Sequence, residues 1–584
     1  MLALDTETAL IASGLLAPPL TCISLASPEQ TALLNRWEFP PALLGQTLVG
    51  HNIAYDMGVL AAEFPELLPA VFQAYDENRI TDTQLREQLT HIAANCYRMQ
   101  VLDDGSAKPV GYHLSDLAER HLGRKLDKDT WRLRYGELRD IPCSAWDPGA
   151  REYAQTDARV TYDIWAIQEQ NAGYLEDQYR QARAAWWLHL CSAWGLVVDQ
   201  DKVTALEVTW REEYAKIGAA CQAAKLVRKD GSRDMKAIKA LVEAAYGAEA
   251  PRTEVGNVQT DAVTLRDSGD PTLHALASYA GLQKKIGTDI PILREGLIQS
   301  RYVPLVTSGR TSSTKPNVQN WARKGGQREC ITPRPGYVFV IADYSMAELH
   351  SWAQQCLDLG IGSTMAEVLN SGRDPHAELA LDLGHAGSDE EFKQLRGAAK
   401  VANFGCPTGM GAVTFRKHAL TSWGIRMTPD EADKAVRGWR AKWGESKAYF
   451  DAVGRMKEAG GVWQNRSRRF RGETSFTETA NTLFQGLTAD FTKDAGYEIT
   501  RQCYLGGGPL LGSRVVAFIH DEYLLEVPEE GAHECAMEVK RIAEERANLW
   551  TPDVPNHVEP IVSRIWSKRA EQRWEKGRLV PWEG

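Results

Sequence analysis

Apolar residues recur along the chain with two kinds of spacing, which predict buried strands and amphipathic helices. Short runs that are apolar at nearly every position, at 1–4, 337–342 and 514–519, predict buried strands. A further apolar run at 523–527 follows closely on the last of these, so the two together predict a hairpin with its turn at 520–522. Between residues 175 and 188 the apolar positions follow helical spacing instead. The chain is therefore predicted to combine helices with buried strands.

The length and composition limit the class of protein. A chain of 584 residues is too long for one hydrophobic core and predicts about three to five domains or subdomains. Its formal net charge of −10 argues against a protein that coats nucleic acid with its whole surface, but it allows a basic cleft in an acidic body. The ten cysteines form no Cys-x-x-Cys pair, which disfavours a structural zinc site and fits a reducing cytoplasm. No signal peptide and no membrane-spanning stretch is expected.

Acidic residues gather at three places in the N-terminal region. Asp5 and Glu7 follow the first apolar run, and residues i and i+2 of a strand point to the same face. Asp56 lies one helical turn after an asparagine, and Tyr153 and Asp157 lie one turn apart in a later segment. Adjacent carboxylates repel each other unless a cation lies between them. The pattern therefore favours a metal site, although each short motif also occurs by chance.

A second set of acidic residues lies in the C-terminal half. Asp343 ends the apolar run 337–342, and Asp521 lies in the predicted hairpin turn. If the two met, two metal ions could bridge their carboxylates. Between them in the sequence, Arg396, Lys400 and Phe404 recur at every fourth position, which places them on one face of a helix. Two cations on one face can bind a triphosphate, although a surface helix would also carry such residues.

The N-terminal motifs, in this order and spacing, resemble the proofreading exonucleases of the DEDD superfamily, Tyr-type. The resemblance covers residues 1–170 and implies a ribonuclease-H-like fold with 3′-5′ exonuclease activity. It implies that four carboxylates hold two divalent metal ions, Mg²⁺ or Mn²⁺: Asp5, Glu7, Asp56 and Asp157. By the same resemblance Tyr153 orients the attacking water.

The C-terminal motifs resemble those of family A DNA polymerases, the family of the bacterial polymerase I large fragment and of related phage enzymes. The segment beginning at Asp343 resembles motif A, the helix from 396 to 405 resembles motif B, and the turn at 520–522 resembles motif C. The segment 307–320 resembles the stretch that contacts the primer–template before motif A. The resemblance implies an α/β and α+β multidomain protein in which the exonuclease domain precedes a right-hand polymerase with palm, fingers and thumb. It also implies DNA-directed DNA synthesis with dNTPs as substrates.

The same resemblance assigns roles residue by residue. Two metal ions would be held by Asp343 and Asp521, with the Tyr344 carbonyl as a further ligand and Glu522 as an auxiliary catalytic residue. The nucleotide site would consist of Arg396, Lys400, Phe404, His376, Glu348 and Tyr344. Of these, Lys400 would donate a proton to pyrophosphate and Glu348 would exclude a ribose 2′-hydroxyl. The DNA contacts would be Arg310, Asn317, Gln319, Asn320, Gln485, His520 and Arg469.

The predicted division of the chain follows from these motifs. Residues 1–170 form the exonuclease domain, 171–306 connecting helices and the thumb, 307–365 palm, 366–465 fingers and 466–584 palm. A basic run at 225–239 indicates a phosphate-gripping arm or a solvated helix face in equal measure. One departure from the family lies at Cys406-Pro407-Thr408, where the family usually continues its helix toward a tyrosine. Proline predicts that the helix ends or bends near 406 and that Thr408 stands in place of the tyrosine.

The motifs leave four functions to compare. Template-directed synthesis with editing is favoured; a related RNA polymerase is disfavoured by Glu348, and a DNA-binding protein with decayed sites is disfavoured by the intact acids. A polymerase fold that acts mainly as an exonuclease stays open. Primer–template DNA is the expected partner of a monomer, with a possible helicase, primase or single-strand-binding protein at a replication fork. The compact form, which begins at the exonuclease, suggests a phage-type replication enzyme in the cytoplasm of a host.

Overall fold

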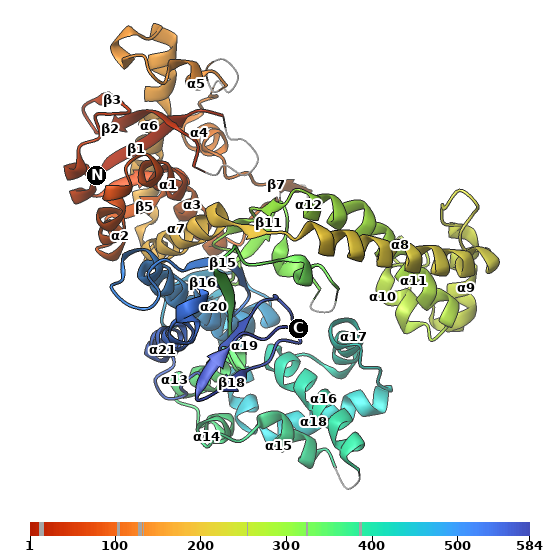
Figure 1. The fold of residues 1–584 in the computed structure, drawn as a ribbon. Coiled ribbons are helices and arrows are strands. Elements are labelled where there is room, and N and C mark those ends of the chain that lie inside the picture. Colours follow the sequence, from red (N-terminus) through yellow and green to blue (C-terminus); the bar gives the residue numbers. More distant parts are fainter. Residues whose placement is uncertain are drawn as a thin grey trace.

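The computed structural model describes residues 1–10, 17–101, 106–126, 131, 133–253, 255–322, 325–384 and 388–584, with the side chains of 421–423 excepted. Its N-terminal domain is built on a five-stranded sheet in the order β3-β2-β1-β4-β5 (Figure 1). The strands are β1 (Leu2–Thr8), β2 (Leu20–Ala26), β3 (Thr31–Asn35), β4 (Leu48–Gly50) and β5 (Ile80–Asp82). The main helices around it are α1 (Ile53–Glu63), α2 (Leu68–Asp76), α3 (Thr83–Ala93), α4 (Leu114–Leu122), α5 (Tyr135–Leu138) and α6 (Pro148–Gln168).

Local chemistry explains where the helices of this domain begin. Asp82 accepts hydrogen bonds from the main-chain N–H groups of Gln84 and Leu85, and it therefore caps the N-terminus of α3. Asp147 caps α6 in the same way, and Pro148 is tolerated in the first turn because that turn needs no main-chain donor. α6 packs against β1 and β2, so the Tyr153 segment is brought to the strand that carries Asp5.

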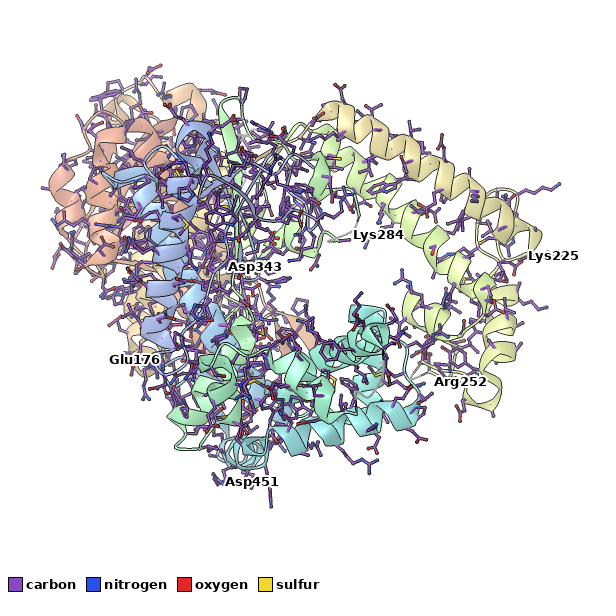
Figure 2. All side chains as sticks on the ribbon, turned by 60° about the horizontal axis from the view of Figure 1, so that its bottom comes forward. Glu176, Lys225, Arg252, Lys284, Asp343 and Asp451 are labelled. Atoms are coloured by element: carbon purple, nitrogen blue, oxygen red, sulfur yellow. The ribbon has the colours of Figure 1, made fainter. Side chains whose placement is uncertain are left out.

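A helical arm extends from the body of the molecule (Figures 1 and 2). The helical segment begins with α7 (Gln178–Trp194), which packs against α1 and β5 in the body. It continues into the arm with α8 (Gln200–Ala223), α9 (Met235–Tyr246), α10 (Ala262–Asp267), α11 (Pro271–Lys284) and α12 (Ile290–Arg294). The short strand β8 (Leu196–Val197) interrupts it after Gly195 and pairs with β9 (Leu297–Ile298). The tip has its own core, in which Tyr214 stacks on Tyr279 at 4.5 Å between ring centroids. Most cations of the 225–239 run are exposed, as either interpretation of that run requires.

A four-stranded antiparallel sheet forms the centre of the C-terminal half, in the order β15-β16-β12-β17. Its strands are β12 (Tyr337–Asp343), β15 (Arg514–Ile519), β16 (Glu522–Pro528) and β17 (Ile561–Ser563). Both faces are buried, since Val340 packs with α20 (Phe476–Leu505) and α21 (Ala532–Trp550), whereas Ile341 packs toward the arm. This burial explains the continuous apolar runs, and it confirms the predicted strands and hairpin.

The helices between residues 347 and 458 form a separate layer below this sheet in Figure 1. They are α13 (Ala347–Asp358), α14 (Thr364–Asn370), α15 (Pro375–Asp382), α16 (Asp389–Gly405), α17 (Ala412–Trp423), α18 (Pro429–Lys442) and α19 (Glu445–Glu458). Trp352, Trp439 and Tyr449 form the centre of their core. α16 ends at Gly405 and is followed by a 3₁₀ turn, Cys406–Thr408, which confirms the helix end predicted from Pro407.

Short hairpins complete the structure. They are β6 (Met99–Val101) with β7 (Ala107–Pro109), β10 (Arg301–Val303) with β11 (Ser312–Thr314), β13 (Gly461–Trp463) with β14 (Phe470–Gly472), and β18 (Arg573–Glu575) with β19 (Arg578–Val580). Among the described residues, none of the helices has the length and apolar character needed to cross a membrane.

Candidate active sites

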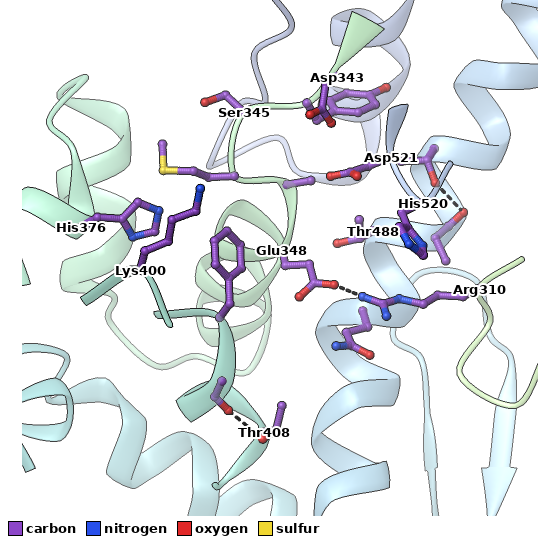
Figure 3. Close-up of a pocket in the computed structure, with 18 of the residues that line it drawn as sticks. Arg310, Asp343, Ser345, Glu348, His376, Lys400, Thr408, Thr488, His520 and Asp521 are labelled. Carbon is purple, nitrogen blue, oxygen red and sulfur yellow. Dashed lines mark hydrogen bonds and ion pairs between the residues drawn. The ribbon is translucent and has the colours of Figure 1, made fainter. Parts of the chain in front are cut away.

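Asp343 and Asp521, the acidic residues predicted to hold metal ions, line one cavity of about 620 Å³ at the central sheet. Asp343 is the last residue of β12 and lies opposite Glu522 in the strand ladder. Asp521 lies in the two-residue turn between β15 and β16, where His520 adopts a φ of 62°. Asp343, Asp521 and His520 all line the cavity, and Figure 3 shows the two carboxylates on one side of it. The strand pairing therefore joins residues almost 180 positions apart in the sequence.

The helix α16 forms the opposite wall of this cavity. Lys400 lies on this wall near His376 from α15 (Figure 3), and Arg396 and Phe404 also line the cavity. The ring of His376 lies 5.5 Å from that of Phe404, and burial lowers the pKa of His376 to about 4. Asn403 lies 3.0 Å from Nδ1 of the same histidine and holds the ring in place. The wall thus presents a neutral imidazole beside two basic side chains.

Glu348 lies at the floor of the cavity and forms an ion pair with Arg310. Glu348 comes from the first turn of α13, whereas Arg310 comes from the turn before β11. Burial lowers the pKa of Arg310, and the negative charge of Asp521 opposes this effect. The dashed contact in Figure 3 shows that the carboxylate faces the guanidinium across the cavity floor.

A buried ionic cluster lies beneath the Arg310 turn. Lys493 donates to the carbonyl oxygens of Gly309 and Pro304 at 2.7 and 3.1 Å. Arg469 donates to Asp177 and Asp490, at 2.7 Å each, and is 1% exposed. The prediction of a DNA contact for Arg469 does not fit this position, because the guanidinium is enclosed by protein and its charge is already balanced. The arginine serves instead to join α7, α20 and the β13–β14 hairpin.

The other predicted DNA contacts fall into two groups. Gln485 and His520 line the cavity. The segment before motif A is largely occupied with its own fold: Asn317 accepts from the main chain of Asn320, and the amide of Gln319 donates to Thr311 and to the carbonyl of Phe518. Asn320 is exposed.

Two residues predicted next to the metals have structural partners. Glu522 is 4% exposed, accepts from Arg328 at 3.3 Å and from the indole of Trp566 at 3.0 Å, and does not line the cavity. The ring of Tyr344 packs on Phe491, and its hydroxyl donates to a main-chain carbonyl, so this side chain is committed to the core.

Thr408 lines the cavity at the position where a tyrosine was expected. Its hydroxyl donates to the carbonyl of Gly405 at 2.7 Å, which satisfies a main-chain acceptor at the end of α16. The next residue, Gly409, has a φ of 83°, and a Cβ there would meet the Phe476 ring at 2.5 Å. The short turn thus replaces a helical continuation by a tightly packed bend.

Sequence reasoning missed Lys568, which also lines the cavity. Its ammonium lies 3.4 Å from Oδ2 of Asp343. No local pattern identifies this lysine, because it follows the last strand of the sheet in a segment without periodicity. Only the folding of the C-terminal segment back over β12 brings it to the site.

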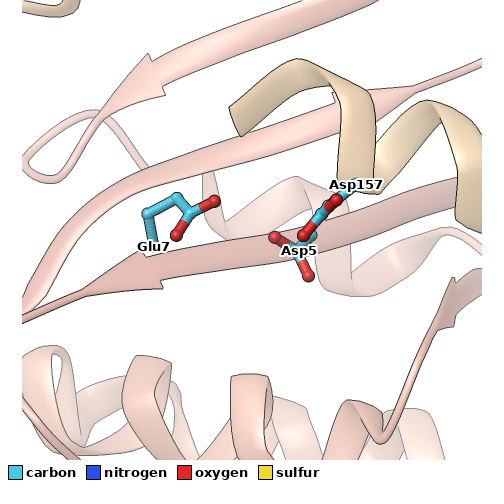
Figure 4. A group of neighbouring side chains, drawn as sticks. All are labelled: Asp5, Glu7 and Asp157. Carbon is cyan, nitrogen blue, oxygen red and sulfur yellow. The ribbon is translucent and has the colours of Figure 1, made fainter. Parts of the chain in front are cut away.

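The second acidic site lies in the N-terminal domain (Figure 4). Asp5 and Glu7 project from one face of β1, and Asp157 projects from α6, so that one carboxylate oxygen of each lies within 4.8 Å of the others. Burial raises the pKa of Asp5 well above its usual range, and the charges of Asp56, Asp157 and Glu7 raise it further. Such crowding of like charges is what a bound cation relieves.

The charge of Asp56 acts on Asp5, and Tyr153 lies on α6 one turn before Asp157. Oδ1 of Asp56 accepts from the main-chain N–H and the hydroxyl of Thr6, at 3.0 and 2.6 Å, while burial raises the pKa of Asp56 to about 7. Tyr153 is half-buried, with its ring 5.9 Å from that of Tyr135.

The donor sets of the two sites fit hard divalent cations. Asp5, Glu7 and Asp157 offer three converging oxygens, and Asp343 and Asp521 offer carboxylates in one shared cavity. Mg²⁺ and Mn²⁺ are bound in proteins through such oxygens, often one or two carboxylates at a time.

The architecture defines a right-hand polymerase body joined to an exonuclease-like domain, and comparisons with known proteins agree. Residues 218–568 match DNA polymerase family A, and residues 1–170 match the family of 3'-5' exonucleases. DNA polymerase I of Aquifex aeolicus is 24% identical over 97% of this chain and 96% of its own length. The thermostable DNA polymerase I of Thermus aquaticus is 26% identical over 73% of this chain but only 52% of its own length.

A solved structure shows the same fold. The POL domain of Pol1 from M. smegmatis, in complex with DNA primer-template and dNTP, superposes with a TM-score of 0.71 at 20% identity, over 97% of this chain and 95% of that one. The chain belongs to DNA polymerase family A and carries a 3′-5′ exonuclease domain at its N-terminal end.

Proposed function

We propose that this protein extends a DNA primer with dNTPs on a template strand and removes nucleotides from the primer 3′ end with its N-terminal domain. The observation that carries the proposal is the single cavity in which Asp343, Asp521, Lys400 and Glu348 converge from four separate segments. Two carboxylates on one wall and two cations on the other match a triphosphate that bridges metal ions and basic side chains.

The side chains of the cavity would share the work as follows. Arg396 and Lys400 bind the phosphates, with Lys400 placed to protonate the leaving pyrophosphate, and the neutral His376 donates a hydrogen bond beside them. Phe404 packs against the nucleotide, and Glu348, held by its ion pair with Arg310, occupies the space that a ribose 2′-hydroxyl would need. Gln485 and His520 would contact the primer–template in the same cavity, with Arg310.

Each site would hold two divalent ions, and the oxygen ligands favour Mg²⁺ or Mn²⁺. In the polymerase site these ions would be held by Asp343 and Asp521, with the main-chain carbonyl of Tyr344 as a further ligand. When bound, such ions lower the pKa of the attacking hydroxyl and stabilise the charge of the leaving group. Glu522 would act indirectly: it lies outside the cavity and supports the position of Asp343 through the strand ladder that the two residues share.

The exonuclease site would use Asp5, Glu7 and Asp157 as the principal metal ligands, with Asp56 close beside them. Tyr153 lies on the same helix as Asp157, one turn earlier, and would orient the water that attacks the 3′-terminal phosphodiester.

The proposed partners follow from the chemistry of these sites. They are primer–template DNA and dNTPs, the same kinds of molecule that the M. smegmatis POL domain holds in its complex. We also propose the five-part division of the chain: exonuclease, connecting helices with thumb, palm, fingers and palm. A monomeric state, a cytoplasmic location, and contacts with a helicase, primase or single-strand-binding protein remain predictions. The Aquifex and Thermus relatives are bacterial polymerases, so these comparisons do not support the predicted phage-type role.

A labelled primer–template tests the proposal. With Mg²⁺ at low salt, where phosphate contacts are strong, the primer is expected to lengthen when dNTPs are present and to shorten when they are omitted. A template-dependent sequence of additions distinguishes copying from untemplated transfer. Shortening alone, under conditions that leave the protein folded, would overturn the polymerase proposal and make the exonuclease the main activity.

A further inference from the structure

We propose that Lys568 is a displaceable counter-ion of Asp343 that competes with a divalent cation and so sets the metal affinity of the polymerase site; this inference rests on the proposed function. Nζ of Lys568 lies 3.4 Å from Oδ2 of Asp343, and both side chains are partly exposed, 41% and 33%. Lys568 lines the same cavity as Asp521 and Lys400.

The position of Lys568 is determined by its neighbours in the C-terminal segment. Trp566 is 1% exposed, and its indole donates to Glu522 at 3.0 Å. The hydroxyl of Ser567 donates to Glu329 at 3.0 Å and accepts from the main-chain N–H of Arg569 at 3.2 Å. Anchors on the residues just before and after Lys568 therefore direct its side chain into the cavity.

Glu522, on the strand paired with that of Asp343, provides a comparison because its counter-ion is buried and fixed in place. Glu522 is paired with Arg328, and these side chains are only 5% and 3% exposed, with the guanidinium 4.6 Å from the centre of the Trp566 ring. A buried, planar guanidinium held in this way stays with its carboxylate. Lys568 instead contacts Asp343 through a flexible four-carbon side chain at a more solvent-exposed position. A divalent cation that binds Asp343 more tightly can therefore displace its ammonium group.

For electrostatic reasons, Lys568 and a divalent cation cannot both bind the carboxylate of Asp343. An ammonium within hydrogen-bonding range of a carboxylate oxygen neutralises part of the charge that attracts a metal, and it repels a divalent ion bound to the same group. Metal binding at Asp343 must therefore displace Lys568, and the lost ion pair is subtracted from the binding free energy. A partly exposed pair predicts an effect of about two- to fivefold on the dissociation constant.

Binding of Mn²⁺, measured by the electron paramagnetic resonance of the free ion, tests this inference without any turnover. The protein is the full chain with Asp5→Ala and Glu7→Ala, so that the exonuclease site does not contribute, and it contains no DNA or nucleotide. Lys568→Gln is expected to bind Mn²⁺ about two- to fivefold more tightly than its parent. Lys568→Arg, which keeps the charge, is expected to show no such gain. Lys576→Gln, in the exposed turn of the C-terminal hairpin, is the matched control and should leave the affinity unchanged.

A double-mutant cycle with Asp343→Asn separates the possible outcomes. If Lys568 acts through Asp343, Lys568→Gln has no effect in the Asp343→Asn protein, and its effect in the parent declines as salt is raised. Unchanged or weaker Mn²⁺ binding by Lys568→Gln, with binding that still depends on Asp343, would overturn this inference alone. Mn²⁺ binding that does not depend on Asp343 at all would overturn the proposed metal site together with it.

Discussion

The two acidic sites of this protein handle negative charge in opposite ways. In the N-terminal domain, Asp5, Glu7 and Asp157 crowd their oxygens within 4.8 Å, and burial together with mutual repulsion raises the pKa of Asp5. In the central sheet, Asp343 is paired with Lys568, and Glu522 is held by Arg328 outside the cavity. At the N-terminal site, carboxylates therefore repel one another until a cation binds. At the central sheet, basic side chains of the protein balance the negative charge.

The difference reflects how each site is built. The N-terminal acids lie on one strand and one helix that pack directly against each other, and this packing brings three carboxylates together. Several segments line the cavity of the central sheet, and three of them contribute cations: Arg310, Lys568, and Arg396 together with Lys400 from α16. A site that must also bind a triphosphate needs positive charge of its own.

Removing Asp343 should have the largest effect. Asp343→Ala is expected to reduce primer extension by roughly 10³-fold or more, because a lost metal ligand costs several kcal/mol of transition-state stabilisation. Shortening of the primer in the absence of dNTPs should continue at the parent rate, as measured on the same labelled DNA. Loss of both activities would show that the two sites are not independent.

The matching change at the other site should give the reverse result. Asp5→Ala with Glu7→Ala removes two of the three converging oxygens, so 3′ degradation is expected to fall by a similar factor of roughly 10³ while extension persists. The rates are measured with a mismatched and a matched primer end. Degradation that survives in the double variant would contradict the assignment of this group as the exonuclease site.

The burial of Asp56 in this domain predicts a pH dependence of local stability. The pKa of Asp56 is raised from its usual 3.8 to about 7, so the folded domain holds a proton that the unfolded chain has lost. Its contribution to stability is therefore present below about pH 4 and is lost as pH rises to about 7, by at most about 4 kcal/mol.

Hydrogen exchange of the amides of α1 and β1, in a metal chelator at pH 5 and pH 8, measures this effect. Asp56→Asn, whose side-chain oxygen can still accept from Thr6, should flatten the dependence, and added Mg²⁺ should restore protection to the parent at pH 8. An equal slope in parent and variant would exclude Asp56 as its source.

The smallest effect is expected at the sugar side of the polymerase cavity. Phe404→Tyr adds one hydroxyl to a ring that lines the cavity beside His376, and it is expected to ease the incorporation of dideoxynucleotides by about tenfold, the value of one hydrogen bond. Chain termination on a running-start template, with dNTP and ddNTP in competition, gives the ratio. Equal termination by the two proteins would mean that Phe404 does not face the sugar.

Much of the architecture was predictable because it depends on local pattern. The apolar runs at 337–342 and 514–519 became β12 and β15, and Pro407 ended α16 at Gly405 as expected. The meeting of Asp343 and Asp521 was also anticipated, since a strand end and a hairpin tip with matching motifs point to one place. For the strands and the helix end, the signal lies within a few residues of the feature that it predicts, whereas the meeting of Asp343 and Asp521 followed from the family resemblance.

The positions of several charged residues were not predictable in this way. A run of arginines around 469 is typical of a DNA-tracking surface, yet Arg469 is enclosed between Asp177 and Asp490. Glu522 follows Asp521 in the motif, yet its carboxylate lies outside the cavity, where it is paired with Arg328. Each outcome depends on a partner that lies 20 to nearly 300 residues away, and composition near the residue carries no record of it.

The sequence by itself determined the order of the strands and helices, the family motifs and the acids on which two metal sites can be built. Only the tertiary structure decided which of those acids face a cavity, which cations accompany them and that Lys568 reaches Asp343. The physical reason is that hydrophobic periodicity specifies which face of an element is buried, whereas the charge balance of a site depends on every segment that packs around it.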